Sequence, residues 1–190
     1  MRSTPHASDR APLLIRSARP DEAARLAELM ERTFRDTYAH NSTASELEKF
    51  VPDHFSPAHQ ARELADPGLR TLLAEPDGGA EPVAFAQVRL PGARPAPPCV
   101  EARRPAELSR FYVDRPWHGR GVAAPLMDAC VAVATESGAD ALWLLVYRIN
   151  DRAIAFYRKC GFAPVGTAPF RFGDELHEDV VMARPLAARD

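Results

Sequence analysis

The spacing of hydrophobic positions changes along the chain between the two-residue period of strands and the longer period of helices. A short apolar run at residues 13–16 predicts the first strand. The apolar positions after it recur at helical spacing and predict a helix with one buried face: Ala23, Leu26, Ala27, Met30 and Phe34. Residues 44–66 are expected to form two further helices, which Pro52 and Pro57 interrupt. The first third of the chain is therefore expected to be mostly helical.

Two apolar runs in the next part of the chain predict an antiparallel pair of strands. They cover residues 70–74 and 82–90, and the sequence Asp-Gly-Gly at positions 77–79 supplies a turn between them. Five prolines then fall within residues 91–105. Because this stretch has little apolar periodicity, we expect an exposed loop rather than a linker between domains.

The second half of the chain predicts the order strand, glycine loop, helix, strand, helix, strand, strand. The first of these strands is expected at residues 108–113, and a helix with one apolar face is expected between Val122 and Gly138. Residues 141–146 are continuously apolar, which is typical of a central strand covered on both faces. A strand, a crossover helix and a second strand form a right-handed parallel unit. The predicted fold class is α/β, a mixed sheet with antiparallel strands early, a parallel pair in the middle and helices on both faces.

Length and composition limit the class of protein. The 190 residues correspond to about one domain, which we expect at residues 12–187 after a polar, disordered tail at residues 1–11. Apolar residues make up 46% of the chain and charged residues 26%, which excludes a wholly disordered protein. The formal net charge of -2 gives no electrostatic reason to expect nucleic acid as a partner.

Targeting signals and metal-binding patterns are not evident in the sequence. No apolar run approaches the roughly 18 residues that cross a bilayer, and the polar N-terminus lacks the apolar centre of a secretory signal. The three cysteines are widely spaced and the six histidines are scattered, so we expect neither a disulfide framework nor a metal site. A reduced, cytoplasmic location without a membrane partner is therefore expected.

The first candidate functional motif lies between the strand at residues 108–113 and the helix that follows it. The segment 118–123 contains Gly119 and Gly121, which permit a tight turn and a close approach of a ligand to backbone N–H groups. The free N–H groups and the dipole of a helix start favour an anion there. A phosphate-binding loop and a plain turn are both consistent with this segment alone.

The residues around the glycines narrow the choice of ligand. Arg115 and Arg120 add positive charge, and Pro125 is tolerated only in a first helical turn, which places the helix start close to the glycines. A triphosphate-binding loop is excluded because no Gly-Lys-Ser/Thr sequence is present. A dinucleotide fingerprint is disfavoured, since Asp140 precedes the next strand instead of ending it.

A second motif follows the central strand. Asn150 or Asp151 is suited to cap a short helix, and Gly161 is suited to end it. The pattern Asn-x-x-Ala-x-x-Phe-Tyr-x-x-x-Gly-Phe at residues 150–162 resembles the second cofactor motif of the GCN5-related N-acetyltransferase superfamily, and the glycine loop resembles its pyrophosphate-binding loop. The matching block spans about residues 106–186. The resemblance implies that superfamily's fold and an acetyl-CoA-dependent N-acetyltransferase.

The resemblance also implies cofactor-binding residues along this block. The backbone of Phe111 and Val113 would bind the pantetheine arm, Asn150 would meet the pantetheine or the acetyl end, and Tyr157 would lie beside the sulfur. The residues that would hold the pyrophosphate are His118, Gly119, Arg120, Gly121, Val122 and Ala123. Because the family usually has Gln or Arg at the position of His118, ionisation of this histidine is expected to enter cofactor binding.

The chemistry of acetyl transfer suggests roles for three residues. An amine acceptor with a lysine-like pKa of about 10.4 must lose a proton before it attacks the thioester. A strand N–H such as that of Val113 is expected to stabilise the charge on the carbonyl oxygen, and Tyr157 to protonate the leaving thiolate. Packing of Tyr157 beside Phe156 as a buried aromatic is the alternative. Glu107 is a candidate to order a water for the amine proton, and a solvated glutamate at a strand end is its alternative.

The acceptor is expected to be a primary amine of a small molecule, such as a polyamine, or of a peptide. Residues 33–38 and the acid-rich stretch with Glu46, Glu48 and Asp53 resemble a bacterial branch of the superfamily that includes polyamine acetyltransferases. A CoA-binding sensor with little catalytic activity and a structural domain with this fold are the alternatives. The C-terminal strands, which end near residues 181–182, are candidates for pairing across a homodimer.

Overall fold

The computed structural model describes residues 13–38, 52, 54–76, 81–172 and 175–187, and the strands among them form one seven-stranded sheet. The strands are β1 (Leu13–Ser17), β2 (Leu69–Pro76), β3 (Ala84–Arg89), β4 (Pro105–Val113), β5 (Ala141–Val146), β6 (Ala163–Phe172) and β7 (Glu175–Pro185). Their order in the sheet is β1-β2-β3-β4-β5-β7-β6. The pair β4–β5 is parallel and the other neighbouring pairs are antiparallel, which confirms the predicted mixed sheet.

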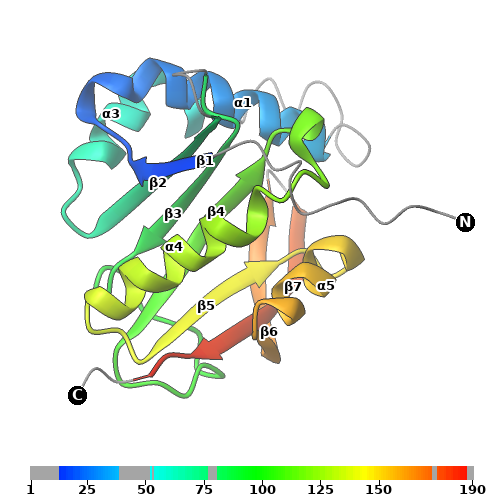
Figure 1. The fold of residues 1–190 in the computed structure, drawn as a ribbon. Helices are drawn as coiled ribbons and strands as arrows, with labels where there is room; N and C mark the ends of the chain where they lie inside the picture. The colour runs from blue at the N-terminus through cyan, green and yellow to red at the C-terminus, as the bar shows by residue number, and fades with distance from the viewer. Residues whose placement is uncertain (1–12, 39–51, 53, 77–80, 173–174, 188–190) are drawn as a thin grey trace, which may run out of the picture.

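Helices cover both faces of this sheet (Figure 1). The described α-helices are α1 (Ala23–Tyr38), α3 (Pro57–Ala65), α4 (Ala123–Glu136) and α5 (Asp151–Lys159). In β2, Leu73 packs in a cluster with α1, whereas Leu72 and Ala74 pack in a cluster with α4. Because successive side chains of a strand point to opposite faces, α1 and α4 lie on opposite faces of the sheet. The rings and apolar side chains of α5 pack on the same cluster as α4.

Local sequence signals explain where the N-terminal helices begin. A 3-10 turn at Pro20–Glu22 precedes α1, and the Glu22 carboxylate accepts a hydrogen bond of 2.7 Å from the backbone N–H of Arg19. Ser56 caps α3 by accepting a hydrogen bond from the N–H of His59, and Pro57 occupies the first helical turn. α3 confirms the later of the two helices predicted within residues 44–66, and most of the earlier one lies outside the described residues.

The expectation of an exposed loop at residues 91–105 was wrong in part. β4 begins at Pro105, and Val100 is 8% exposed and packs with Trp143 of β5 and Val181 of β7. Among the described helices, α1 and α3 cover only the β1–β4 side of this face. The segment before β4 therefore supplies the apolar cover over β5 and β7 itself.

The parallel pair in the middle of the sheet is short. β4 and β5 pair only over residues 105–107 with 141–143, and the two strands then diverge (Figure 1). β5 pairs along its whole length with β7, so β7 lies between β5 and β6. We call the point where the pairing ends, at Glu107 and Trp143, the strand junction. Beyond it, the edge of β4 that faces β5 is not part of a described strand pair.

Some expectations concern parts of the chain that lie outside the described residues. These parts include the tail at residues 1–11 and the acids Glu46, Glu48 and Asp53. The single-domain boundaries at residues 12–187 stay a prediction. Among the described helices, none has the length and apolar character that a bilayer span requires.

Candidate functional site

The open edge of β4 presents backbone groups toward the space between β4 and β5. The N–H of Asp114 donates a hydrogen bond of 2.8 Å to the carbonyl of Val83, on the β3 side. N–H groups alternate in direction along a strand, so those of Phe111 and Val113 point to the other side, toward β5. Beyond the strand junction, no described pairing with β5 uses this edge. These two N–H groups are therefore spaced along the edge so that they can donate to the carbonyls of an extended chain that contains amides.

The glycine loop follows β4 directly and leads into α4. A 3-10 turn at Arg115–Trp117 is followed by Gly119 and Gly121, whose φ angles are +76° and +81°. Residues with side chains rarely adopt these positive angles, so the turn depends on glycine. α4 starts at Ala123, as Pro125 predicted, and its first N–H groups have no partner within the helix. The guanidinium of Arg120 lies 5.5 Å from the centre of the Trp117 ring.

His118 contacts both sides of the space between β4 and β5. Its Nε2 lies 2.8 Å from the carbonyl oxygen of Val113, and its Nδ1 lies 3.0 Å from Nη1 of Arg152 in the first turn of α5. A guanidinium only donates, so Nδ1 is the acceptor and the proton is assigned to Nε2, which donates to the carbonyl. The imidazole thus links the end of β4 with the start of α5.

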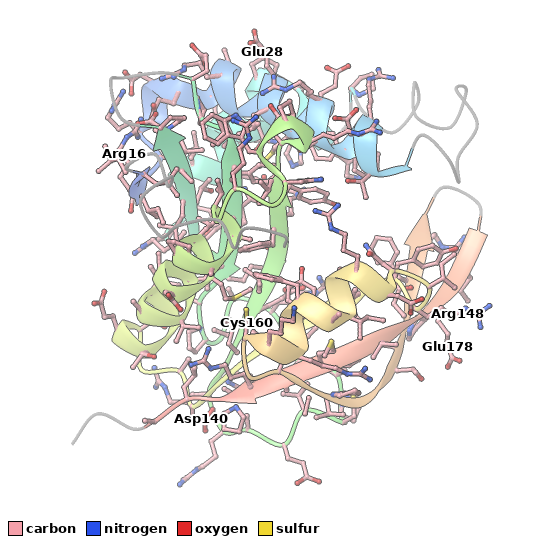
Figure 2. All side chains as sticks on the ribbon, turned by 45° about the vertical axis from the view of Figure 1, so that its right-hand side comes forward. Arg16, Glu28, Asp140, Arg148, Cys160 and Glu178 are labelled. Carbon is pink, nitrogen blue, oxygen red and sulfur yellow. The ribbon has the colours of Figure 1, made fainter. Side chains whose placement is uncertain are left out.

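Asn150 is the N-cap of α5. Its side-chain oxygen accepts a hydrogen bond of 3.1 Å from the N–H of Ala153, and its carbonyl accepts one from Ile154. Figure 2 shows Arg148 before the start of this helix and Cys160 at its other end. The cap uses the side-chain oxygen of Asn150 and leaves its NH₂ group as a donor.

Tyr157 lies on α5 next to the open edge of β4. Its ring meets Phe111 edge-on at 6.4 Å, and Phe111 also stacks on Phe156 at 5.6 Å. Burial raises the pKa of the Tyr157 phenol above its usual value of about 10, and the neighbouring Tyr112, Cys130 and Cys160 add to this shift. The phenol therefore stays protonated at neutral pH. The structure brings together Tyr157 and Phe111, two of the residues singled out by the sequence.

Glu107 lies at the strand junction and is 5% exposed. Its Oε1 accepts a hydrogen bond of 3.1 Å from Arg94, and its buried Oε2 has no hydrogen-bond partner among the described residues. Burial raises the pKa of Glu107 above its ordinary value, although Arg94, Arg89 and Arg110 oppose the shift. A buried carboxylate with one oxygen uncommitted differs from the solvated strand-end glutamate that was the alternative.

Sequence reasoning missed several side chains at this site. Arg152 contacts His118, and its position two residues after Asn150 was the available signal. Arg32 of α1 places two nitrogens 3.0 Å from one carboxylate oxygen of the buried Asp114, which fixes α1 against the start of the glycine loop. Because Arg32 and Asp114 are far apart in the sequence, no local pattern indicates this ion pair.

The comparisons with known proteins agree with this arrangement. The profile of the Acetyltransferase (GNAT) family matches residues 25–162. An uncharacterized N-acetyltransferase of Mycobacterium tuberculosis is 35% identical over 165 residues, which cover 87% of this chain and 98% of that protein. One named for its place beside pepI in Lactobacillus delbrueckii is 23% identical and covers 83% of this chain and 88% of its own length.

Solved structures show the same fold at lower identity. The PaiA N-acetyltransferase of Thermoplasma acidophilum, in complex with coenzyme A, superposes with a TM-score of 0.71 at 18% identity, over 92% of this chain and 99% of that one. A GCN5-related N-acetyltransferase of Rhodopseudomonas palustris gives a TM-score of 0.70 at 23% identity, over 96% and 100%. These likenesses bear on the arrangement of helices and strands.

Proposed function

The chain belongs to the acetyltransferase (GNAT) family, and we propose that it transfers an acetyl group to a primary amine of a small molecule or a peptide. Membership of the family makes it an N-acetyltransferase with acetyl-CoA as its cosubstrate. The observation that carries the proposal is the open edge of β4 beside the glycine loop. A thioester substrate with an amide-containing arm and a pyrophosphate requires both features together.

The phosphate end of the cosubstrate fits the loop that leads into α4. The segment 118–123 has positive-φ glycines, a free helix N-terminus and the charge of Arg120, and Arg152 adds a second guanidinium across the opening. The Nδ1 of His118 already accepts from Arg152, so the imidazole orients this arginine. We assign pyrophosphate binding to the backbone of this segment, with the arginines as supporting charges.

The pantetheine arm fits the edge of β4. The N–H group of Val113 would donate to one of its amide carbonyls, that of Phe111 would face the thioester end of the cosubstrate, and the NH₂ group of Asn150 would supply a donor from the α5 side. An arm laid along this edge runs from the loop toward the strand junction. Its sulfur end then passes Phe111 and the phenol of Tyr157.

The chain's residues have complementary tasks during transfer. Bound acetyl-CoA supplies the thioester carbonyl; the amine nitrogen forms a bond to the acetyl carbon as the C–S bond breaks. A strand N–H stabilises the charge that develops on the carbonyl oxygen, and the ring contact with Tyr157 favours Phe111 over Val113 for this role. Tyr157 donates the proton that the leaving thiolate requires, because its raised pKa keeps the phenol protonated.

Glu107 is the candidate that removes the proton from the amine. It lies four residues before Phe111, about 13 Å along a strand, so a chain of ordered waters between carboxylate and amine is required to complete the path. The uncommitted Oε2 is the oxygen available to such a water. The raised pKa of Glu107 makes its carboxylate a stronger base than an exposed glutamate.

Finer aspects of the function rest on the sequence alone. A polyamine acceptor was suggested by the acid-rich stretch at Glu46, Glu48 and Asp53, which lies outside the described residues. Pairing of C-terminal strands across a homodimer and a cytoplasmic location stay predictions. The comparisons give no support to a CoA-binding sensor with little activity.

The proposal is tested by binding and turnover measured on the full chain. Calorimetry with coenzyme A reports binding, and release of free thiol from acetyl-CoA reports transfer across spermidine, aminoglycosides, amino acids and peptides. We expect one class of amine to accelerate release, and Tyr157→Phe to lower kcat about 100-fold with the Kd for coenzyme A unchanged. An unchanged Tm shows that the variant keeps its packing. Binding without acceleration by any amine would support the sensor, and absence of binding would contradict the proposed site.

A further inference from the structure

A group of charged side chains surrounds the strand junction on one face of the sheet. We call it the junction cluster, and its members are Glu63 of α3, Arg89 of β3, Arg94 of the segment before β4, and Glu107 and Arg110 of β4. Ala106 and Leu108 pack in the core beneath α4, so Glu107 between them points to the opposite face. Phe111 and Tyr157 belong to the α4 side. The proposed thioester arm and the junction cluster therefore approach the strand junction from opposite faces.

Within the junction cluster, the charges of Glu63 and Arg110 neutralise each other. Nη1 of Arg110 lies 2.6 Å from Oε2 of Glu63, and Gln87 contacts both groups. Burial works against the charge on Glu63, but Arg110, Gln87 and His59 hold the pKa of its carboxyl below the ordinary value. Glu63 is therefore ionised at neutral pH and balances Arg110. The remaining charges are the two guanidiniums of Arg89 and Arg94 against the single carboxylate of Glu107.

Arg89 and Arg94 are only loosely bound within the described part of the chain. Arg94 is 55% exposed and makes one hydrogen bond there, to Glu107. Arg89 is 28% exposed and makes two ion pairs of 3.9 Å, to Glu63 and Glu107, and no hydrogen bond to a described residue. A guanidinium carries five N–H donors, so most donors of this arginine pair are uncommitted. Two such groups beside a strand junction are suited to hold a planar anion by paired hydrogen bonds.

We propose that the acceptor carries a carboxylate near its primary amine and that Arg89 and Arg94 bind this carboxylate. The inference rests on the proposed function, because it assumes that the amine enters from the face opposite the thioester arm. An amino acid or a related amine with a carboxylate supplies the missing negative charge. A polyamine meets the net positive charge of Arg89, Arg94 and Glu107 and lacks an anion for the arginines.

The test compares acceptors with and without this charge. Thiol release from acetyl-CoA is measured with glycine, leucine, glutamate and β-alanine. Each is compared with the derivative in which the carboxylate nearest the amine is a carboxamide, and spermidine is measured as well. We expect the best carboxylate acceptor to exceed its carboxamide about 10-fold or more in kcat/KM. In Arg89→Gln, Arg94→Gln and the double variant, we expect this ratio to fall, and to fall most in the double variant.

Matched controls separate binding of the carboxylate from other effects. Loss of Arg94 also changes the surroundings of Glu107, but that change acts on both members of an acceptor pair and cancels in the ratio. Arg103→Gln removes an exposed arginine of the same segment, whose side chain makes no hydrogen bond to a described residue, and is expected to leave the ratio unchanged. Calorimetric titration of the coenzyme A complex with the preferred amino acid and its carboxamide gives the same comparison without turnover.

The outcomes distinguish this inference from the proposed function. If spermidine or the carboxamides react as well as the carboxylate acceptors, transfer to amines stands and the role of the arginines is overturned. The role of the arginines is also overturned if the kcat/KM ratio between carboxylate and carboxamide acceptors is unchanged in the double variant. If no amine of any class accelerates thiol release, the proposed function fails and this inference fails with it.

Discussion

At the scale of single residues, the direction of each β4 side chain decides its role. Glu107 points to the face of the junction cluster, whereas Phe111 packs beside Tyr157 on the other face. The register between β3 and β4 shifts at Gln87 and Val88, and this irregularity places Arg110 on the face of Glu107, three residues away. A regular strand would turn residues 107 and 110 to opposite faces.

Glu107→Gln is the residue-scale prediction. The base acts in its ionised form, so the wild-type kcat/KM is expected to fall as pH decreases through the pKa of Glu107, which burial raises above 4.5. In Glu107→Gln we expect kcat/KM at pH 7 to fall at least about 10-fold and this acid limb to disappear. A pH profile of thiol release measures both. Glu101→Gln, an exposed glutamate of the segment before β4, is the matched control and keeps the limb.

Stability should change in the opposite direction to activity. A carboxyl whose pKa is raised on folding contributes stability that is fully present below the unfolded pKa and is lost as pH rises through the folded pKa. At pH 7 the ionised Glu107 therefore costs stability, and the glutamine variant is expected to have an equal or higher Tm. A lower Tm together with lower activity would mean that Glu107 is structural, and would contradict its assignment as a base.

At the scale of elements, the glycine loop depends on backbone conformation and not on space. A Cβ at Gly119 or at Gly92 would meet no atom within 4 Å, and both residues have positive φ, +76° and +88°. At both positions an alanine is therefore disfavoured by the positive φ angle and not by a steric clash. Gly92 lies in the turn after β3, at the opposite end of β4 from the glycine loop, which makes it a matched control for Gly119.

Gly119→Ala is expected to weaken coenzyme A binding about 10-fold, because the loop must shift its N–H groups to relieve the strain. Strain at a positive φ costs about 1–2 kcal/mol, so both alanine variants should lose a similar amount of stability. Thermal unfolding measures that loss, and calorimetry with coenzyme A measures binding. Gly92→Ala should bind as the wild type does. Equal affinities in the two variants would show that the loop does not hold the pyrophosphate.

The elements of the second half could be predicted because each has a local signal. Pro125 fixed the start of α4, Asn150 the cap of α5, and the apolar run at residues 141–146 the central strand. The position of β7 between β5 and β6 could not be predicted, since it depends on pairing between distant segments. Arg32 on Asp114 was not predicted for the same reason, and Arg94 at the junction was not predicted because its contact depends on how the segment before β4 packs against the sheet.

At the scale of the whole molecule, the chemistry and a large ion cluster lie in different parts of the sheet. Arg16 of β1 bridges two buried carboxylates, with its Nη2 2.6 Å from Oε1 of Glu22 and 2.6 Å from Oε1 of Glu75 of β2. β3 separates these strands from the proposed cofactor edge of β4. Arg16 and Glu28 lie toward the end of the molecule opposite Asp140 (Figure 2). Changes in this cluster should therefore alter stability without altering transfer.

Glu22→Gln tests this separation. The hydrogen bonds from Arg16 lower the pKa of Glu22 to about 2, and the backbone N–H of Arg19 adds to the shift while burial opposes it. A lowered pKa means that the stability from the ionised carboxylate is fully present above the unfolded value of 4.5 and is lost as pH falls toward 2. At pH 7 we expect a loss of about 2–3 kcal/mol, or a Tm lower by about 5–10 °C.

The Tm difference between wild type and Glu22→Gln should then narrow from pH 5 to pH 3, as Glu22 in the unfolded chain takes up its proton. Glu28→Gln is the matched control, because Glu28 is an exposed glutamate of α1 without an ion pair to a described residue, and its Tm should change by less than about 1 °C. At 25 °C and pH 7, kcat and KM should match the wild type in both variants. A fall in kcat with an unchanged Tm would show that the ion cluster reaches the transfer site through α1, where Arg32 contacts Asp114.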